Sequence, residues 1–289
     1  MAKGYPLGMF MKEFGTEKKC REYLANLRWP DGFVCPQCGC RHTCLLSNGR
    51  YQCAECRRQT SVTAGTVLHR THTPLTQWFL AFCFVSQDKR GISAAALMSM
   101  LGTTYKTAWY MLMRIRTAMG QRDKTHQLNG TIEFDDTCFG GPTVGKKRGW
   151  GTEKAKVFVA VSLDERGNPR YAKMQVTQNI KRACVKKFAQ AAFAQGSTIH
   201  SDGYGSYIPA LEGYTHEHKP YAPDSGLLHW LHIVISNAKA FILGTYHGLP
   251  KKYLQTYLDE YCFRFSRRGF RPRLLERLAL ALGASVRLT

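Results

Sequence analysis

The sequence predicts an α/β fold in which a mixed sheet flanked by helices follows a small cysteine-rich module and a helical segment. Three observations indicate this order: two closely spaced cysteine pairs near the N-terminus, helical apolar periodicity after them, and strand-like runs beyond residue 130. We expect parts bounded at residues 1–62, 63–128, 129–268 and 269–289, the last being a basic C-terminal helix.

The charge balance is strongly basic. Lys and Arg number 41 and Asp and Glu 20, which gives a net charge of +21 in 289 residues. Such an excess disfavours a compact chain unless a polyanion binds it, so nucleic acid is the expected partner. A merely basic, ribosome-associated protein is the alternative.

The sequence argues against a membrane-spanning or secreted protein. No stretch approaches the roughly 20 apolar residues of a membrane span, and the N-terminus lacks the pattern of a signal peptide. The 11 cysteines are too sparse for a disulfide scaffold, so in a reducing cytosol they should be metal ligands or core thiols. We therefore expect a cytoplasmic, nucleoid-associated protein.

Apolar spacing predicts the individual elements. Helices are expected at residues 16–27, with Thr16 as the N-cap, and at 75–87, 92–101 and 105–119, followed by a polar linker at 120–130. Beyond the linker, strands are predicted at residues 131–137, 156–162, 170–176 and 198–202. Further helices are predicted at residues 180–195, 204–211, 229–243, 250–264 and 272–283.

Two C-x2-C pairs, separated by 14 residues, predict a structural zinc site. Each pair suits a tight knuckle, and two knuckles place four thiolates around one ion in a tetrahedron, as in a zinc ribbon. The four cysteines are Cys35, Cys38, Cys53 and Cys56. Two redox pairs are the alternative, and Cys40, His42 and Cys44 are weaker candidates for a substitute ligand.

The break at residues 102–104 between two amphipathic helices resembles a helix-turn-helix, whose second helix would start at Tyr105. A recognition helix presents early polar residues to base edges and basic residues to phosphates. The DNA-binding candidates are therefore Lys106, Arg114 and Arg116. The alternative is an ordinary helical connector with solvated charges.

Acidic residues at the ends of two predicted strands indicate a divalent-cation site. Glu133 and Asp135 share one face of the first strand by period-two alternation, and Asp136 points away. Asp202 ends the short fourth strand, and carboxylates on neighbouring strand ends can bind one or two Mg²⁺ or Mn²⁺ ions for in-line phosphoryl chemistry. A turn or helix-cap role is the alternative for Asp202.

Residues 225–258 contain no glutamate that could supply a third carboxylate. The helix predicted there offers His232, Asn237 and Lys239 instead. His232 and Lys239 are seven residues apart and nearly eclipsed, whereas Asn237 faces elsewhere. This geometry favours His232 as the third ligand and Lys239 as a phosphate contact, with a core or surface histidine as the alternative.

A glycine-rich loop after the first strand carries three consecutive cations, Lys146, Lys147 and Arg148. The loop is suited to contact the phosphate backbone of a nucleic acid, and the alternative is a solvated hairpin. A group of arginines near the C-terminus has two similar interpretations, contact with phosphates or a solvated basic face. They are Arg264, Arg267, Arg268, Arg271, Arg273 and Arg277.

In their order, these motifs resemble those of a bacterial insertion-sequence transposase of the ISXO2-like type, with an N-terminal zinc ribbon and a ribonuclease H-like DDE catalytic domain. The resemblance covers most of the chain. The matching runs are RWPDGFVCPQCG at residues 28–39, TAGT at 63–66, IEFDDT at 132–137, HSDGY at 200–204, GTYHG at 244–248 and DEYCFRF at 259–265.

The resemblance implies that Asp135 is the first acid, with Asp136 in place of the family's Glu, and that Asp202 is the second. The third acid, seven residues before a basic residue, falls on His232. Some members are described with Asn as the third residue, which keeps Asn237 as the second candidate. It also implies Mg²⁺- or Mn²⁺-dependent cleavage at element ends and strand transfer to target DNA, by a homodimer or larger assembly that reads terminal repeats.

Two other functions fit the same residues. One is a ribonuclease H-like nuclease or resolvase, which shares the chemistry but needs no paired element ends. The other is a DNA-binding regulator derived from an inactive transposase, which the missing third carboxylate suggests.

Overall fold

The computed structural model describes residues 5–141, 154–220 and 226–284, without the side chains of 271, 272 and 282–284. They belong to two compact units, each of which is described by itself. The N-terminal unit comprises residues 1–122 together with 270–289, and the sheet unit comprises residues 123–269. The C-terminal helix thus groups with the start of the chain. The parts predicted from the sequence are consecutive and do not include this grouping.

The cysteine-rich module is a small antiparallel sheet in the order β1-β2-β3. Its strands are β1 (Thr43–Leu45), β2 (Tyr51–Cys53) and β3 (Gln59–Thr60). Few apolar side chains support it: Phe33 stacks on Tyr51 with 5.6 Å between ring centroids, and Trp29 packs edge-on against both rings. So small a core needs additional stabilisation, which four cysteines bound to one ion would supply.

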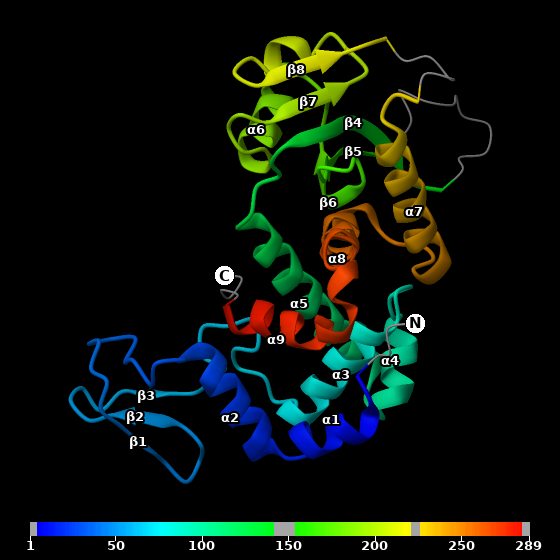
Figure 1. Ribbon diagram of the computed structural model, residues 1–289. Coiled ribbons are helices and arrows are strands. Elements are labelled where there is room, and N and C mark those ends of the chain that lie inside the picture. The colour runs from blue at the N-terminus through cyan, green and yellow to red at the C-terminus, as the bar shows by residue number, and fades with distance from the viewer. Residues whose placement is uncertain (1–4, 142–153, 221–225, 285–289) are drawn as a thin grey trace. The chain divides into compact units, whose positions relative to one another are not determined.

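Helices form the rest of the N-terminal unit, which is drawn from blue to green, with its last helix in red, in Figure 1. Thr16 caps α2 as predicted, since its hydroxyl accepts a hydrogen bond from Lys19 N. Phe14 and Phe79 pack in the core with ring centroids 4.7 Å apart. The helices are α1 (Leu7–Phe14), which was not predicted, α2 (Glu17–Arg28), α3 (Leu75–Gln87), α4 (Ala94–Leu101), α5 (Tyr105–Lys124) and α9 (Leu274–Ala284).

The predicted linker at residues 120–130 is wrong in its first half, because α5 continues to Lys124. Gly120, in this polar stretch, is buried, and Asp123, the first residue of the sheet unit, has partners within that unit. Arg267 lies 2.7 Å from the Asp123 carboxylate, and Lys173 donates a hydrogen bond to the Asp123 carbonyl. Leu128 then forms a parallel bridge with Phe193, so the second half of the stretch is ordered as well.

The sheet unit contains a five-stranded mixed sheet in the order β6-β5-β4-β7-β8. The first three strands in the chain pair antiparallel, and β7 and β8 run parallel to β4. Numbered within the unit, the order is 3-2-1-4-5, which is the ribonuclease H-like arrangement. The strands are β4 (Thr131–Phe139), β5 (Ala155–Leu163), β6 (Pro169–Thr177), β7 (Thr198–Ser201) and β8 (Thr215–His218).

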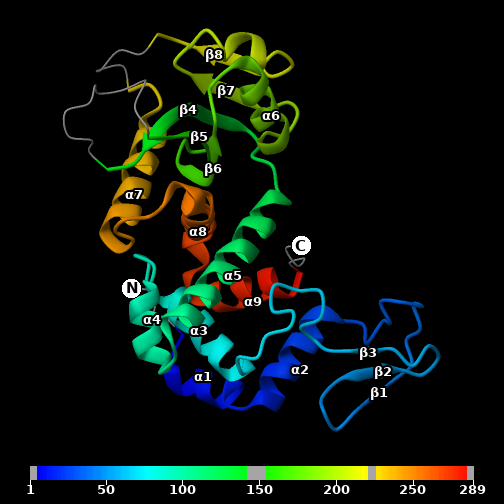
Figure 2. The same cartoon turned by 180° about the vertical axis from the view of Figure 1, so that it is seen from behind.

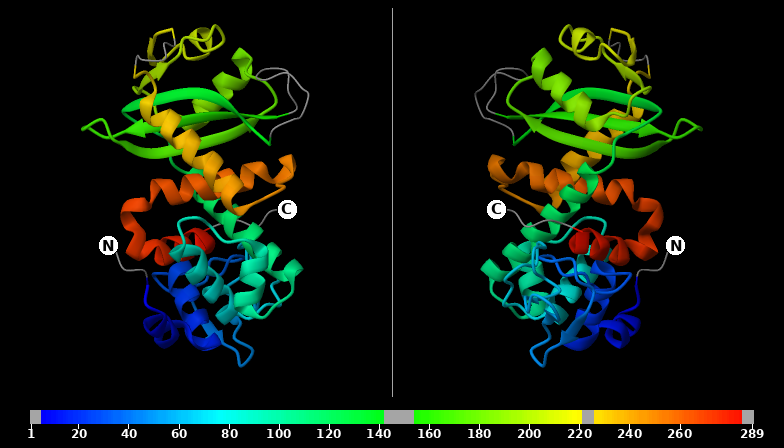
Figure 3. Two further views of the ribbon diagram at one scale, coloured as in Figure 1. Left: turned by 90° about the vertical axis from the view of Figure 1, so that its right-hand side faces the viewer. Right: turned by 90° about the vertical axis from the view of Figure 1, so that its left-hand side faces the viewer.

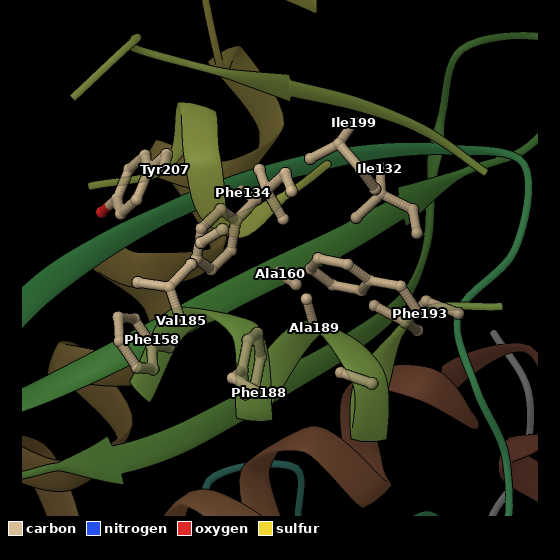
Figure 4. Close-up of a cluster of buried hydrophobic side chains, with 14 of the residues drawn as sticks. Ile132, Phe134, Phe158, Ala160, Val185, Phe188, Ala189, Phe193, Ile199 and Tyr207 are labelled. Carbon is tan, nitrogen blue, oxygen red and sulfur yellow. The ribbon is translucent and has the colours of Figure 1, made fainter. Parts of the chain in front are cut away.

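One face of the sheet is covered by α6 (Arg182–Ala192). Figure 4 shows Ile132 and Phe134 of β4 packed with Phe188 of this helix in a buried apolar cluster. The same cluster receives Tyr207 from the segment after β7. In that segment the structure has a short 3-10 turn, η1 (Ile208–Ala210), in place of most of the helix predicted at 204–211.

The other face of the sheet is covered by α7 (His229–Thr245) and α8 (Leu254–Ser266), and Figures 2 and 3 show both against the strands. Gln255 extends the hydrogen-bond ladder of β6, since its side chain accepts from Val176 N and donates to the Met174 carbonyl. The 3-10 turns η2 (Lys251–Tyr253) and η3 (Arg268–Arg273) flank α8.

Three of the C-terminal arginines have structural partners. Arg264 is buried and pairs with Glu260 at 2.7 Å, and Arg267 pairs with Asp123. Arg268 donates to the Arg170 carbonyl and lies over the Phe265 ring. Each of these three arginine side chains therefore has a partner within the protein and does not need a DNA phosphate to balance it. Within the described ranges, no helix is both long and apolar enough to cross a membrane.

Candidate functional site

The four cysteines of the ribbon converge as the sequence predicts. The Sγ atoms of Cys35 and Cys56 are 3.5 Å apart, those of Cys38 and Cys53 are also 3.5 Å apart, and all four lie within 4.8 Å of one another. Zn–S bonds of about 2.3 Å in a tetrahedron place sulfurs about 3.8 Å apart. The four thiolates therefore fit a structural Zn²⁺.

The backbone conformation after each cysteine pair also suits a zinc knuckle. Gly39 follows the first C-x2-C pair with φ of 73°, and Arg57 follows the second with φ of 58°. After these left-handed residues, the backbone N–H groups of Cys40 and Arg58 point back at the sulfurs of Cys38 and Cys56. Within the first knuckle, hydrogen bonding from Cys38 N–H lowers the pKa of the Cys35 thiol to about 6. Arg57 adopts the left-handed conformation at a cost that glycine would avoid.

The acidic site is built where β4 runs beside the end of β7. These parallel strands pair Glu133 with His200, and β7 ends at Ser201. Extending the register by two residues sets Asp202 opposite Asp135, and neighbouring strands lie about 4.8 Å apart. Topology therefore brings together two carboxylates that are 67 residues apart in the chain.

Asp136 points to the other face, as period-two alternation predicts. Its backbone pairs with Phe158 in the α6-covered cluster, whereas Asp135 pairs with Val159. Both carboxylates nevertheless meet one hydroxyl group: Tyr207 Oη lies 2.5 Å from Asp136 Oδ1 and 3.3 Å from Asp135 Oδ1. Asp135 Oδ1 also accepts a 2.7 Å hydrogen bond from Asp136 N.

Burial and mutual repulsion perturb these acids. Burial, together with the charges of Asp202 and Asp136, raises the pKa of Asp135 to about 7. Burial and the charge of Asp202 likewise raise the pKa of Asp136, although the Tyr207 hydroxyl opposes this. Partly buried carboxylates that repel one another disfavour ionisation until a cation binds, and a hard divalent ion is the usual occupant.

Glu133 is a functional candidate whose role the sequence does not reveal. Its carboxylate accepts a 2.6 Å hydrogen bond from Leu231 N, at the first turn of α7. That helix has no side-chain N-cap of its own, because Leu228 precedes it and its aliphatic side chain has no hydrogen-bond acceptor. Glu133, only 7 % exposed, therefore caps α7 from β4, two residues before Asp135.

On α7, the structure places Lys239 beside the face of β4 that carries Asp135. Lys239 Nζ donates a 3.0 Å hydrogen bond to Thr137 Oγ1 and lies over the Phe139 ring, and burial lowers its pKa. His232, seven residues earlier, is partly buried, whereas Asn237 is exposed. His232 and Asn237 both line a cavity of about 460 Å³ along α7.

The structure does not bring every candidate ligand together. Across the described residues, the four cysteines form the only group of three or more His, Cys, Asp or Glu ligand atoms all within 4.8 Å of one another. His232 therefore does not join Asp135 and Asp202 in so tight a cluster. Strand register brings Asp135 and Asp202 together, and the assignment of these two aspartates and of a third residue as ligands stays a prediction.

The predicted DNA contacts divide into two kinds. Lys106 is exposed in the first turn of α5, next to Tyr105, which is 57 % exposed. Arg114 instead binds the carbonyls of Val67 and His69 and the hydroxyl of Tyr110.

Arg116 corrects the prediction, because it is 1 % exposed and lies on the buried face of α5. A side chain that lies on this face is not available to a phosphate. Lys146, Lys147 and Arg148 lie outside the described residues.

Sequence reasoning missed Tyr207 as well as the role of Glu133. Only tertiary structure shows that Tyr207, five residues after Asp202, returns to β4. A glutamate two residues before an aspartate in an apolar strand is a usable signal, but from the sequence it indicates only a carboxylate on the Asp135 face. Its actual partner is a helix N-terminus 98 residues away.

Comparisons with known proteins agree with the motifs. Residues 127–266 match the ISXO2-like transposase domain, and residues 15–59 match the transposase zinc-ribbon domain. A relative from the archaeon Halobacterium salinarum, described as an uncharacterized protein in transposable element ISH50, is 25 % identical over 91 % of this chain and 95 % of its own. The chain thus has a relative in an archaeon, outside the bacteria to which the resemblance pointed.

Solved structures with weaker likeness include the Mos1 mariner paired-end complex with Mn, at 12 % identity, with 70 % of this chain and 77 % of that chain covered and a TM-score of 0.31. A pre-cleavage Mos1 transpososome has 12 % identity, coverage of 72 % and 78 %, and a TM-score of 0.29. At such scores the fold assignment rests on the strand order. The two family matches show that this chain carries a transposase zinc-ribbon domain followed by an ISXO2-like transposase domain, in the order that the motifs predict.

Proposed function

We propose that this transposase binds the ends of its element and catalyses metal-dependent phosphodiester cleavage and strand transfer. The observation that carries the proposal is the pair of carboxylates, Asp135 on the central strand and Asp202 just beyond β7, whose charges repel in a partly buried site. A divalent cation, Mg²⁺ or Mn²⁺, supplies Lewis acidity and charge neutralisation there when bound.

The chain's own residues have separate parts in this reaction. Asp135 and Asp202 hold the cation, with His232 as the proposed third ligand and Asn237 as the second candidate. Lys239, fixed beside β4 by Thr137, neutralises charge on the scissile phosphate. In-line alignment of the attacking hydroxyl, from water or from a DNA 3′ end, is the main catalytic contribution.

DNA recognition is assigned to the N-terminal unit. The ribbon, held by one structural Zn²⁺ on Cys35, Cys38, Cys53 and Cys56, and the α4–α5 pair together read double-stranded terminal repeats. Lys106 is the proposed contact on α5. Lys146, Lys147 and Arg148 are proposed to contact the phosphate backbone. Strand transfer requires two paired element ends, each of which is joined to target DNA, so at least a homodimer is expected in the synaptic complex.

The test uses the DNA that flanks the reading frame as substrate, with Mn²⁺ or Mg²⁺. Asp135→Asn and Asp202→Asn should each abolish end cleavage, because a neutral amide does not replace a carboxylate ligand. Glu217→Gln is a matched control, since Glu217 is an exposed acid of the same sheet that pairs with His200. Cleavage by Asp135→Asn at the wild-type rate would overturn the assignment.

One observation favours a second candidate function. His232, the proposed third residue, does not cluster tightly with the aspartates. A regulator that binds element ends without cutting them would show this arrangement. Wild-type protein that binds the ends in the presence of Mn²⁺ but leaves them intact would support that function instead.

A further inference from the structure

We propose that Tyr207 is a positioning residue for the acidic site. Its hydroxyl fixes the Asp136 carboxylate and, together with the Asp136 backbone N–H, holds Asp135 in the orientation that a divalent cation needs. The inference rests on the proposed function, because it takes Asp135 and Asp202 to be the ligands. It makes Asp136 a bridge between Tyr207 and Asp135, and not a ligand itself.

The ring of Tyr207 works as an apolar anchor. The residue is 0 % exposed, and its ring centroid lies 4.9 Å from that of Phe134, the β4 residue just before Asp135. Figure 4 shows the ring beside the apolar cluster with the hydroxyl oxygen directed away from the other labelled side chains. Packing thus fixes where the hydroxyl lies, at the end of β4 that carries the acids.

Distance decides which carboxylate takes the hydroxyl hydrogen. A hydroxyl has one hydrogen, and Asp136 Oδ1 at 2.5 Å is a much better acceptor than Asp135 Oδ1 at 3.3 Å. Asp135 Oδ1 accepts its shorter hydrogen bond from Asp136 N at 2.7 Å, and the Tyr207 hydroxyl is its second, weaker contact. In the described part of the chain, both hydrogen-bond contacts of Asp135 use Oδ1, and Oδ2 is therefore the atom proposed to face a cation.

The same segment also places the second ligand. Asp202 begins the turn, and its carboxylate accepts a hydrogen bond from Tyr204 N at 3.0 Å. Gly203, with φ of 76°, bends the chain there, and a Cβ on it would lie 3.2 Å from His218. Tyr207 ends the turn by donating its N–H to the Tyr204 carbonyl at 2.7 Å. Anchoring Tyr207 therefore ties the position of Asp202 to that of Asp135.

The energetic reason is preorganisation. Three carboxylates that repel one another rotate apart unless hydrogen-bond donors hold them. Loss of an outer-shell partner of a ligating carboxylate typically lowers metal affinity about 10–100-fold. Tyr207→Phe removes the donor and keeps the ring. We expect this variant to bind Mn²⁺ at least about 10-fold more weakly than wild type, with a similar melting temperature.

The experiment titrates zinc-loaded, full-length protein with Mn²⁺ alone and follows free Mn²⁺ by electron paramagnetic resonance. Tyr214→Phe is the matched control, because Tyr214 packs against the same core and its hydroxyl donates to the Ala189 carbonyl, away from the acids. It should bind Mn²⁺ as wild type does. Wild-type affinity in Tyr207→Phe would overturn the proposal.

A second pair of variants keeps the test decisive if Tyr207→Phe folds poorly. Asp136→Asn retains an oxygen that accepts the Tyr207 hydrogen bond, whereas Asp136→Ala does not. We expect Asp136→Asn to retain most of the Mn²⁺ affinity and Asp136→Ala to lose it. Equal losses in both would identify Asp136 as a direct ligand and overturn the bridging role.

The Mn²⁺ titrations distinguish a failure of this inference from a failure of the proposed function. If Asp135→Asn abolishes Mn²⁺ binding while Tyr207→Phe binds normally, only the positioning role of Tyr207 is wrong. If Asp135→Asn binds Mn²⁺ as tightly as wild type, the cation site itself is wrong, and the role of Tyr207 is wrong with it.

Discussion

The Glu133 carboxylate on the central strand accepts a 2.6 Å hydrogen bond from the backbone N–H of Leu231 in the first turn of α7. One strand thus holds a proposed metal ligand, Asp135, and, two residues earlier, the group that fixes the start of the helix carrying His232 and Lys239. The face of β4 that bears Asp135 therefore also fixes the helix that carries the other candidate residues of the site.

Glu133→Ala is expected to lower the free energy of unfolding by about 1–3 kcal/mol, because a buried helix N-terminus loses a charged acceptor. Denaturant titration measures the loss, and hydrogen exchange at the first turn of α7 locates it. Glu217→Ala removes an acid on the same sheet face whose side chain is 64 % exposed, and should cost less than about 1 kcal/mol. Unchanged exchange in α7 would contradict the capping role.

Mn²⁺ affinity is expected to rise as pH increases through about 7, the raised pKa of Asp135. Below this pH the carboxyl group is protonated and must release its proton before a cation binds; above it, no such cost remains. In the metal-free protein the sign is opposite: the free energy of unfolding falls as pH rises towards that pKa, because the folded state favours the proton. Calorimetric titration with Mn²⁺ measures the affinity and denaturant unfolding of the metal-free protein measures the stability, each across this pH range. Asp135→Asn should flatten both profiles.

Lys106→Ala is expected to weaken binding to element-end DNA and to reduce the slope of log affinity against log salt by about 1, as loss of one phosphate contact does. Arg116→Met should lower stability through its buried site and leave that slope unchanged. Fluorescence anisotropy at several salt concentrations separates the two. A reduced slope in Arg116→Met would show that the arginine reaches DNA after all.

Removal of zinc should unfold the ribbon and weaken binding to element ends, because zinc contributes about 10–16 kcal/mol of apparent binding energy to modules of this size. Cys38→Ser should lose the metal, measured as zinc per protein chain. Cys44→Ser, an exposed cysteine outside the quartet, should retain it. Unchanged end binding by the zinc-free protein would remove the ribbon from DNA recognition.

Local patterns predicted much of this structure. The apolar period of α3 and the apolar runs of β4 and β5 are set by burial on one or both faces, and each element appears close to its expected bounds. The zinc site was predictable because its ligands are close in sequence. Thr16 was predictable because capping depends on only a few neighbouring residues.

Features that depend on distant contacts were not predictable in the same way. Strand β8, with the sequence THEH, has no apolar side that would mark it, and it forms because β7 offers a free parallel edge. Tyr207 gains its importance only when the turn after β7 returns to β4. Arg116 is different, since it lies four residues after Leu112 and three before Met119, on the apolar side of its helix, and that spacing was a usable signal of burial.

The return of α9 to the first unit has a consequence for how the molecule is made. Leu274, Leu275 and Leu278 of this last helix are buried, and the helix packs against α2 and α3, which leave the ribosome some 200 residues earlier. Synthesis of the entire sheet unit therefore precedes closure of the unit proposed to read DNA. A nascent chain truncated within the sheet unit would expose the α2–α3 surface, so an incomplete product is poorly suited to occupy an element end in place of the finished protein.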